Sequence, residues 1–279
     1  MFHRTIPLFA SVIALCTTAT AVPAGDVEAP RELSGWGRVL DPSGDCDVSF
    51  DAERDRLRIH VPGTPHVLSA EDSKLPMNAP RVVRRVRGDF TAVVRVLGRL
   101  DPGRSKTTCY DPYHGAGLIV WQDSSNYLRL ERAVGFINGR LHPYVNYELR
   151  ANGRLAMSHG IATEDRSLFL KLRRQGESFS AWYSRDGNRW VPLERVDTTL
   201  EERVEVGVAA VNASARKLSA ELERFRVDDP MGSRARDYGD GDDSSKNMGA
   251  SSSGSERDGA LTSGGGAEPA AAHPGGSAR

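Results

Sequence analysis

The stretch LFLKLRRQGESFSAWYSRDGNRW, residues 168–190, is the clearest indication of the fold in this sequence. Leucine occupies every second position at its start, and a period of two is typical of a strand with one face on a hydrophobic core. Residues Phe179–Trp190 then predict a strand, an Asp186-Gly187 turn and a second strand. A short turn between two such strands makes a hairpin, so this stretch predicts antiparallel β-structure.

The same alternation continues through most of residues 32–227, and no comparable stretch shows a sustained helical period. The alternating apolar positions are Leu57, Ile59 and Val61; Val94 and Val96; Val204, Val206 and Val208; and Leu218, Ala220 and Leu222. The pairs Asn138-Gly139 and Asn152-Gly153 predict tight turns, because both residue types tolerate positive φ. About ten to thirteen strands without crossover helices predict an all-β, two-sheet antiparallel jelly-roll sandwich. A propeller is the alternative, but no blade-length repeat is visible.

The charge balance excludes one class of partner. The chain of 279 residues carries 37 Lys+Arg and 37 Asp+Glu, so its formal net charge is zero. Nucleic-acid-binding domains are normally strongly basic, and we therefore expect no nucleic-acid partner. With 39% hydrophobic and 27% charged residues, the chain is neither a polytopic membrane protein nor disordered throughout.

The two ends of the chain differ in composition from the region between them. Residues 1–21 have a basic start, an apolar run and the small-x-small pattern Ala19-Thr20-Ala21, which predicts a secretory signal peptide and export to the periplasm or beyond the cell. A lipoprotein signal at Cys16 is the alternative. Residues 231–279 contain 11 Gly, 9 Ser and 8 Ala, a composition typical of a disordered tail. The sandwich domain is expected at residues 32–229.

The cysteines are consistent with an exported domain. Removal of the signal peptide leaves Cys46 and Cys109, and two cysteines in an oxidising compartment predict one disulfide. Two unpaired thiols that lie too far apart are the alternative.

A series of short motifs resembles a known family. The motifs are RGDFT (87–91), HGAGLIVWQD (114–123), NYLRLER (126–132), FSAWYS (179–184) and DGNRW (186–190). Together they resemble the concanavalin A-like β-sandwich family that includes the accessory C-terminal domain of β-xylosidases and relatives described as regulation-of-enolase-like. The resemblance covers roughly residues 36–227. It implies two curved sheets of the lectin and glucanase type with twelve to fifteen strands, whose concave face binds glycans in some relatives. It does not imply catalysis, because function depends on the site rather than on the fold.

No catalytic or metal-binding motif accompanies this resemblance. Glycoside hydrolases need two carboxylates across the scissile bond, whereas the strand around residue 131 offers the single carboxylate Glu131 beside Arg129. The pair Glu221 and Glu223 lies on one face but is expected to belong to a solvated charged surface. The aspartates between residues 41 and 55 lack EF-hand spacing, and the histidines are scattered, so we expect no catalytic residue, no metal and no cofactor.

The best binding signal is a group of aromatic and polar side chains, since sugars are bound by aromatic faces and by fork-like hydrogen bonds. The candidate ligand-binding residues are Trp121, Gln122, Asp123, Asn126, Tyr127, Arg129, Glu131, Tyr144, Tyr147 and Trp182, with Asn146 as a further amide. The alternative is that Trp121 and Tyr127 pack in the core, as large aromatic residues often do.

Three functions follow from these observations. The leading hypothesis is non-catalytic binding of a polysaccharide or other glycan on the concave sheet of an exported domain. The second is a structural or protein-interaction module without a carbohydrate ligand. The third is a divergent glycoside hydrolase.

Overall fold

The computed structural model describes residues 31–69, 76–105 and 111–229. The predicted signal peptide, the predicted tail and Cys109 lie outside these ranges. The described part of the chain contains sixteen strands and no helix, so it has no helix that could cross a membrane. Three strands have only two residues, which alternation in a sequence cannot reveal; the other thirteen agree with the expected number.

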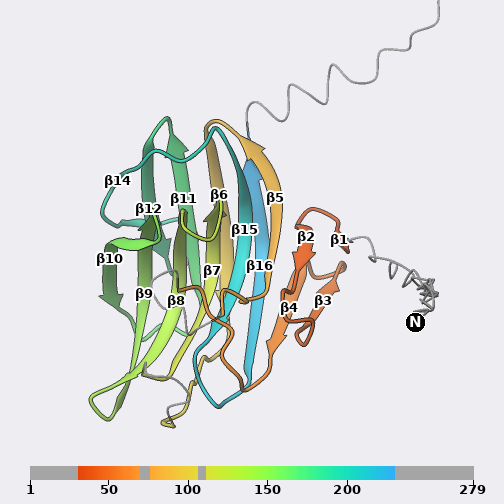
Figure 1. Cartoon of the computed structure of the whole chain (residues 1–279), viewed down its shortest axis with the longest axis vertical. Coiled ribbons are helices and arrows are strands. Elements are labelled where there is room, and N and C mark those ends of the chain that lie inside the picture. Colours follow the sequence, from red (N-terminus) through yellow and green to blue (C-terminus); the bar gives the residue numbers. More distant parts are fainter. Residues whose placement is uncertain (1–30, 70–75, 106–110, 230–279) are drawn as a thin grey trace, which may run out of the picture. The chain divides into compact units, whose positions relative to one another are not determined.

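The strands form two antiparallel sheets, which confirms the predicted all-β sandwich (Figure 1). Sheet A has the order β1 (Glu32–Leu33), β2 (Gly37–Leu40), β5 (Arg81–Arg87), β15 (Arg203–Asn212), β7 (Tyr113–Trp121), β8 (Tyr127–Ile137), β9 (Arg140–Ala151) and β10 (Arg154–Ala162). Sheet B has the order β13 (Val191–Pro192), β12 (Ser178–Ser184), β11 (Leu168–Gln175), β6 (Phe90–Leu97), β16 (Leu218–Asp228), β4 (Arg56–Val61) and β3 (Asp47–Asp51), while β14 (Val196–Asp197) also pairs with β12.

The hydrophobic core lies between the two sheets. Every apolar position of the predicted alternation is buried in it, including Leu57 and Ile59 of β4, Leu170 of β11 and Leu222 of β16. Burial of such a side chain contributes roughly 1.5–3 kcal/mol, so this core fixes which face of each strand points inward. The odd-numbered residues of β7 and β8 therefore point away from sheet B.

The predicted turns are also confirmed. Asn138-Gly139 joins β8 to β9 and Asn152-Gly153 joins β9 to β10, and all four residues have positive φ. The Asp186-Gly187 pair lies in the connection between β12 and β13, which form the predicted hairpin. These turns place β8, β9 and β10 side by side in sheet A, where their outward faces make one continuous surface.

A second, smaller hydrophobic cluster covers part of the outer face of sheet A. Val67 and Leu68, from the connection between β4 and β5, pack there against Ile119 of β7 and Val211 of β15. The connection is anchored by His66, whose backbone pairs with that of Asn212. Sheet A is consequently buried on both faces in this region, and among the described residues a cavity remains on the outer face farther along β8 and β9.

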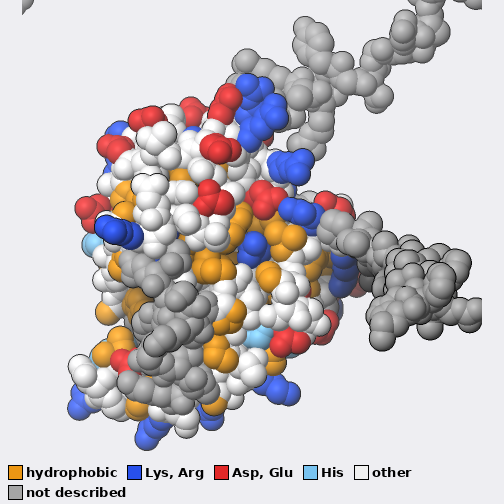
Figure 2. All heavy atoms as spheres, in the orientation of Figure 1, with side chains coloured by type: hydrophobic (Ala, Val, Ile, Leu, Met, Phe, Trp, Pro, Cys, Tyr) orange, Lys and Arg blue, Asp and Glu red, His pale blue; other side chains and the backbone are white. Residues whose placement is uncertain are grey.

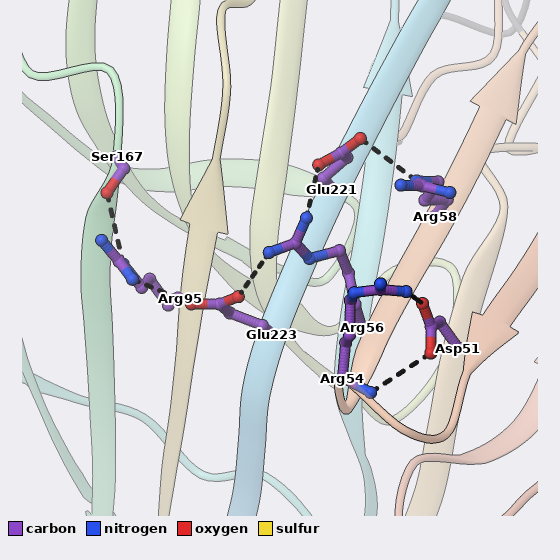
Figure 3. Close-up of polar contacts among 8 residues, drawn as sticks. All are labelled: Asp51, Arg54, Arg56, Arg58, Arg95, Ser167, Glu221 and Glu223. Atoms are coloured by element: carbon purple, nitrogen blue, oxygen red, sulfur yellow. Dashed lines mark hydrogen bonds and ion pairs between the residues drawn. The ribbon is translucent and has the colours of Figure 1, made fainter.

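The outer face of sheet B carries a ladder of ion pairs (Figure 3). Glu223 accepts hydrogen bonds from Arg56 of β4 at 3.1 Å and from Arg95 of β6 at 2.9 Å, and Glu221 pairs with Arg58 at 3.1 Å. The charged face therefore exists, but Glu223 is buried in it, not solvated as expected, and its arginine partners come from the neighbouring strands. Acidic and basic side chains both occur on the face drawn in Figure 2.

Candidate functional site

A cavity of about 390 Å³ lies on the outer face of sheet A. One wall is the connection between β4 and β5, and the floor is formed by β7, β8 and β9. The lining residues used below are Val67, Leu68, Tyr113, Arg129, Ile137, Tyr144, Asn146, Glu148, Arg150 and Ser158. Polar groups on an apolar, concave surface are typical of a small-molecule site.

The register of two strands determines which polar groups meet in this cavity. In the β8–β9 pair, Arg129 lies opposite Glu148 and Glu131 lies opposite Asn146. Because side chains alternate across a strand, Tyr144, Asn146, Glu148 and Arg150 all point outward from β9. The cavity floor is therefore a cross-strand array of acidic and basic groups.

Glu148 links two arginines at the centre of this array. Its Oε2 accepts a hydrogen bond from Nη2 of Arg129 at 2.7 Å, and its Oε1 accepts one from Nε of Arg150 at 2.8 Å. Burial alone would raise the pKa of Glu148, but the two guanidinium groups lower the pKa below its ordinary value. Burial likewise opposes the charge of Arg129, while Glu131 and Glu148 raise its pKa well above the ordinary value. Glu148 and Arg129 are thus charged at neutral pH.

Glu131 lies behind the cavity wall, with its side chain 1% exposed. Its Oε2 accepts a hydrogen bond from the Tyr113 hydroxyl at 2.7 Å and another from Nδ2 of Asn146 at 3.3 Å. Glu131 is therefore a positioning residue for two groups that line the cavity.

Gly115 is what lets Tyr113 reach Glu131. A Cβ atom at residue 115 would lie 2.5 Å from the Tyr113 hydroxyl oxygen, closer than two such atoms can approach. The tyrosine ring therefore lies over the strand only because residue 115 has no side chain. In the sequence Tyr113-His114-Gly115, the glycine two residues after the tyrosine leaves room for the tyrosine ring.

Two tyrosines form an aromatic corner of the cavity. The rings of Tyr113 and Tyr144 meet edge to face, with centroids 6.4 Å apart. Burial, together with the negative charge of Glu131, raises the pKa of Tyr144 to about 12 and that of Tyr113 well above its ordinary value. Both phenols are therefore protonated at neutral pH, and the Tyr113 hydroxyl remains a donor to Glu131.

Four of the residues named from the sequence lie at this cavity. Arg129, Tyr144 and Asn146 line it, and Glu131 lies directly behind its wall. Trp121 and Tyr127 occupy the same outer face but do not line the cavity. Their rings stack at 5.2 Å, and the Arg81 guanidinium lies 4.2 Å from the centroid of the Trp121 ring. The half-buried Trp121 ring is thus in contact with two protein groups, Tyr127 and Arg81.

The structure assigns three other predicted residues to a turn. Asp123 accepts hydrogen bonds from the backbone N–H groups of Ser125 and Asn126. Asn126 accepts one from the backbone of Asn152, and Gln122 accepts one from the backbone of Glu201. Gln122, Asp123 and Asn126 therefore connect β7 to β8 and fix neighbouring loops, instead of joining the aromatic group as expected.

Tyr147 and Trp182 lie elsewhere, which corrects the single cluster expected from the sequence. Tyr147 is fully buried in the core between the sheets, because it stands one residue out of phase with Tyr144 and Asn146. Trp182 lies on β12 of sheet B, opposite Lys171, whose Nζ is 4.6 Å from the centroid of its indole ring.

Sequence reasoning missed Tyr113, Glu148 and Arg150. The signal was present in β9, where strict alternation from Tyr144 selects residues 146, 148 and 150 and rejects residue 147. For Tyr113 the signal is the glycine two residues later. Both signals can be interpreted only when it is known which face of the strand points away from the core.

A second cluster of polar side chains combines residues from segments that are far apart in the sequence. Oxygen, sulfur and nitrogen ligand atoms of Asp45, Cys46 and His66 lie within 4.8 Å of one another, a donor set that could hold a metal ion. His66, in the connection between β4 and β5, and His114, on β7, are both buried. Nε2 of His66 lies at hydrogen-bond distance, 2.7 Å, from Oδ1 of Asp45. Cys46 is a free thiol in the structure, and its candidate disulfide partner Cys109 lies outside the described residues, so that disulfide stays a prediction.

Comparison with known sequences identifies one family. Residues 50–230 match the model of a family described as protein of unknown function (DUF1349). No curated protein matches the chain.

Comparison with solved structures identifies similar folds. A functionally unknown protein from Saccharomyces cerevisiae has 18% identity and a TM-score of 0.58, covering 72% of this chain and 99% of that one. A xylan β-1,4-xylosidase from Bacillus halodurans C-125 has 19% identity and a TM-score of 0.52, covering 72% of this chain and 38% of the xylosidase. The carbohydrate binding module CBM66 from Bacillus subtilis has 13% identity and a TM-score of 0.43, covering 71% of this chain and 99% of the module. The first two likenesses establish the shared fold, and the expected resemblance to xylosidase-associated sandwich domains is confirmed.

Proposed function

The chain belongs to the DUF1349 family, and we propose that the cavity on the outer face of its sheet A binds a neutral saccharide unit of a glycan without cleaving it. The observation that carries this proposal is the Arg129–Glu148–Arg150 array beside the aromatic corner of Tyr113 and Tyr144. Sugar hydroxyls both donate and accept hydrogen bonds, so they need guanidinium donors and carboxylate acceptors in one place. Tyrosine rings supply the apolar surface on which a sugar ring stacks.

The charge of the array supports a neutral ligand. Arg129 and Arg150 are balanced by Glu131 and Glu148, and all four side chains are at least nine-tenths buried. A charged ligand would have to displace one of these ion pairs, whereas a hydroxylated ring can share their remaining donors and acceptors. Burial of these charges also strengthens each such hydrogen bond, because the local dielectric constant is lower than in water.

The geometry favours binding over hydrolysis. A retaining or inverting glycosidase needs a carboxylic acid that can donate its proton to the leaving group. Glu148 has both oxygens held by guanidinium donors, and Glu131 is held by Tyr113 and Asn146 behind the wall. Neither carboxyl group is presented to the cavity as a free acid. This supports a non-catalytic role.

Direct binding measurements test the proposal. Isothermal titration calorimetry and saturation-transfer NMR would be run on the full chain with a panel of neutral mono- and oligosaccharides, including xylose, arabinose, glucose, galactose and fructose. Ser158 is exposed at the cavity rim and is absent from the buried array, so Ser158→Trp should fill the cavity while the fold is retained. We expect at least one saccharide to bind, and Ser158→Trp and Tyr144→Ala to weaken that binding by tenfold or more.

The matched controls lie away from the cavity. Ser124→Trp adds the same bulk in the exposed turn after β7, and Trp182→Ala removes an aromatic ring from sheet B. Both variants should bind like the parent protein. If no saccharide binds at a concentration of about 10 mM, its binding free energy is weaker than roughly −3 kcal/mol. The saccharide-binding proposal then fails, and a structural or protein-interaction module takes its place. Equal weakening by the control variants would also contradict it.

We also propose export through the predicted signal peptide of residues 1–21, on the evidence of its sequence pattern. Amino-terminal sequencing of the protein recovered from the periplasm or culture medium should begin after Ala21 or Ala24. A protein that retains Met1 and stays in the cytoplasm would contradict the proposal.

A further inference from the structure

Arg132 is a buried cation on the side of β8 opposite the saccharide cavity. It alternates in phase with Leu130 and Val134, both of which belong to the core between the sheets, and only 3% of its surface is exposed. Nε of Arg132 donates to the backbone oxygen of Asp165 at 2.9 Å. Nη1 is buried and has no hydrogen-bond partner among the residues that the structure describes.

The protein supplies little negative charge to this guanidinium. No carboxylate within the described ranges forms an ion pair with Arg132, in contrast to Arg129 three residues earlier on the same strand, which has two. Burial lowers the pKa of Arg132 to about 10, and the more distant carboxylate of Asp165 opposes this shift only in part. A buried charge without a counterion is costly, so its persistence calls for a compensating group.

Arg132 lines a cavity of about 300 Å³ at one end of the sandwich. Arg99, from the connection after β6, and Arg166, from the connection between β10 and β11, line the same cavity. Among the described residues of the lining Glu164 is the single acidic one, and the remaining walls are apolar: Leu100, Val134, Leu141 and Pro143. Arg99 is partly compensated, because its Nη2 lies 4.0 Å from Oδ2 of Asp101. The positive charge of this cavity therefore rests mainly on Arg132 and Arg166, whereas the described charges of the saccharide cavity on the other side of β8 are balanced.

We propose that this end cavity binds a small oxyanion, namely a carboxylate, sulfate or phosphate group, with Arg132 as the buried fork and Arg99 and Arg166 at the entrance. The planar guanidinium can donate two parallel hydrogen bonds to two oxygens of such a group. A single backbone carbonyl offers only one oxygen and cannot satisfy the guanidinium in this way. The volume exceeds that of a bare ion, so the anionic group can belong to a larger molecule such as an acidic sugar. The site does not depend on the saccharide cavity for its geometry.

The experiment titrates the full chain with sodium sulfate, sodium phosphate and sodium glucuronate at constant ionic strength set with sodium chloride. The guanidinium Nε–H resonance of Arg132 in ¹⁵N-correlated NMR reports binding at this residue. We expect this resonance to shift in a saturable manner with at least one anion. Saturation by the inorganic anions assigns a free ion as the ligand, and saturation by glucuronate alone assigns an acidic sugar; both outcomes support the oxyanion site.

The variants separate a site from general charge screening. Arg166 is exposed, and within the described ranges its side chain forms no ion pair or hydrogen bond, so Arg166→Gln should retain the fold and weaken binding several-fold. Arg132→Met should abolish binding, while Arg173→Gln, on the exposed face of β11, should leave it unchanged. The proposal is overturned if no anion shifts the Arg132 resonance, or if Arg173→Gln weakens binding as much as Arg166→Gln. If Arg132→Met does not fold, the variants Arg99→Gln and Arg166→Gln still test the proposal, because each should weaken anion binding.

Discussion

Nη2 of Arg129 donates a hydrogen bond to Oε2 of Glu148 at 2.7 Å, across a register in which the two residues are direct neighbours on β8 and β9. Their side chains are 10% and 7% exposed, so the ion pair lies almost entirely out of water. Arg150 binds the other oxygen of the same carboxylate. The floor of the candidate site is therefore a charged element built into the sheet, and its parts depend on one another.

Removal of Glu148 should be far more costly than removal of a surface acid. Glu148→Ala leaves the buried charges of Arg129 and Arg150 without their shared partner, and we expect a loss of about 3–5 kcal/mol in the free energy of unfolding. Urea denaturation at neutral pH measures it. Glu205→Ala is the matched control, because Glu205 pairs with the more exposed Arg38, and its cost should stay below about 1 kcal/mol. Similar losses in the two variants would show that the buried array is not coupled in this way.

The sandwich could be predicted because its information is local. Alternation of apolar residues along β4, β6, β11, β15 and β16 defines the inward faces, and Asn-Gly pairs define two hairpin turns. The two-residue strands escaped prediction because they have no period. The candidate site was only partly predictable, since Arg129, Glu131 and Tyr144 were selected together with residues that have other roles.

The reason for the errors at the site is the packing of distant segments. Tyr147 was grouped with Tyr144 on chemical grounds, although strand alternation places the two on opposite faces. The sequence leaves open whether Trp121 binds a ligand or packs against protein, and the structure places Arg81 and Tyr127 against its ring. No local pattern shows that the connection carrying Val67 and Leu68 folds back over sheet A.

Gly115→Ala should release Tyr113 from Glu131. The added methyl group would lie 2.5 Å from the Tyr113 hydroxyl oxygen, so the ring must move and its 2.7 Å hydrogen bond must break. The pKa of the freed phenol should fall toward about 10, the ordinary value for tyrosine. Alkaline titration followed by ultraviolet difference spectroscopy should then show one additional tyrosine that ionises in the ordinary range. The double variant Tyr113→Phe, Gly115→Ala should not show it, and an unchanged titration of the single variant would refute the argument.

The ion-pair ladder of sheet B should contribute modestly to stability (Figure 3). Glu223 is 8% exposed and bonds Arg56 and Arg95 from the two strands that flank β16. Glu223→Gln keeps the shape of the side chain but removes its charge, and we expect a loss of about 1–2 kcal/mol, as is typical of charge-assisted hydrogen bonds. Chemical denaturation with urea gives the value. Glu202→Gln, in an exposed pair with Arg87, should lose less than half as much; a larger loss there would contradict the ladder's role.

Acid should destabilise the fold through His114. This side chain is buried beside Ser214 and the backbone oxygen of Arg216, and burial lowers its pKa from about 6.5 to about 4. The unfolded chain therefore binds a proton that the folded chain does not between these two pH values, and stability must fall as the pH falls from 6.5 to 4. The shift corresponds to a loss of up to about 3 kcal/mol over this window.

Urea denaturation of His114→Gln between pH 7 and pH 4 isolates this contribution. The amide can replace the donor to Ser214 and Arg216 but does not titrate, so the variant should lose less stability than the parent protein over the same window. His142→Gln is the control, because His142 is exposed at the β8–β9 turn and should leave the parent's pH dependence intact. Parallel plots of unfolding free energy against pH for His114→Gln and the parent protein would show that His114 does not carry the acid sensitivity. A group contributes to the pH dependence of stability only if the folded and unfolded states differ in their proton binding at that group.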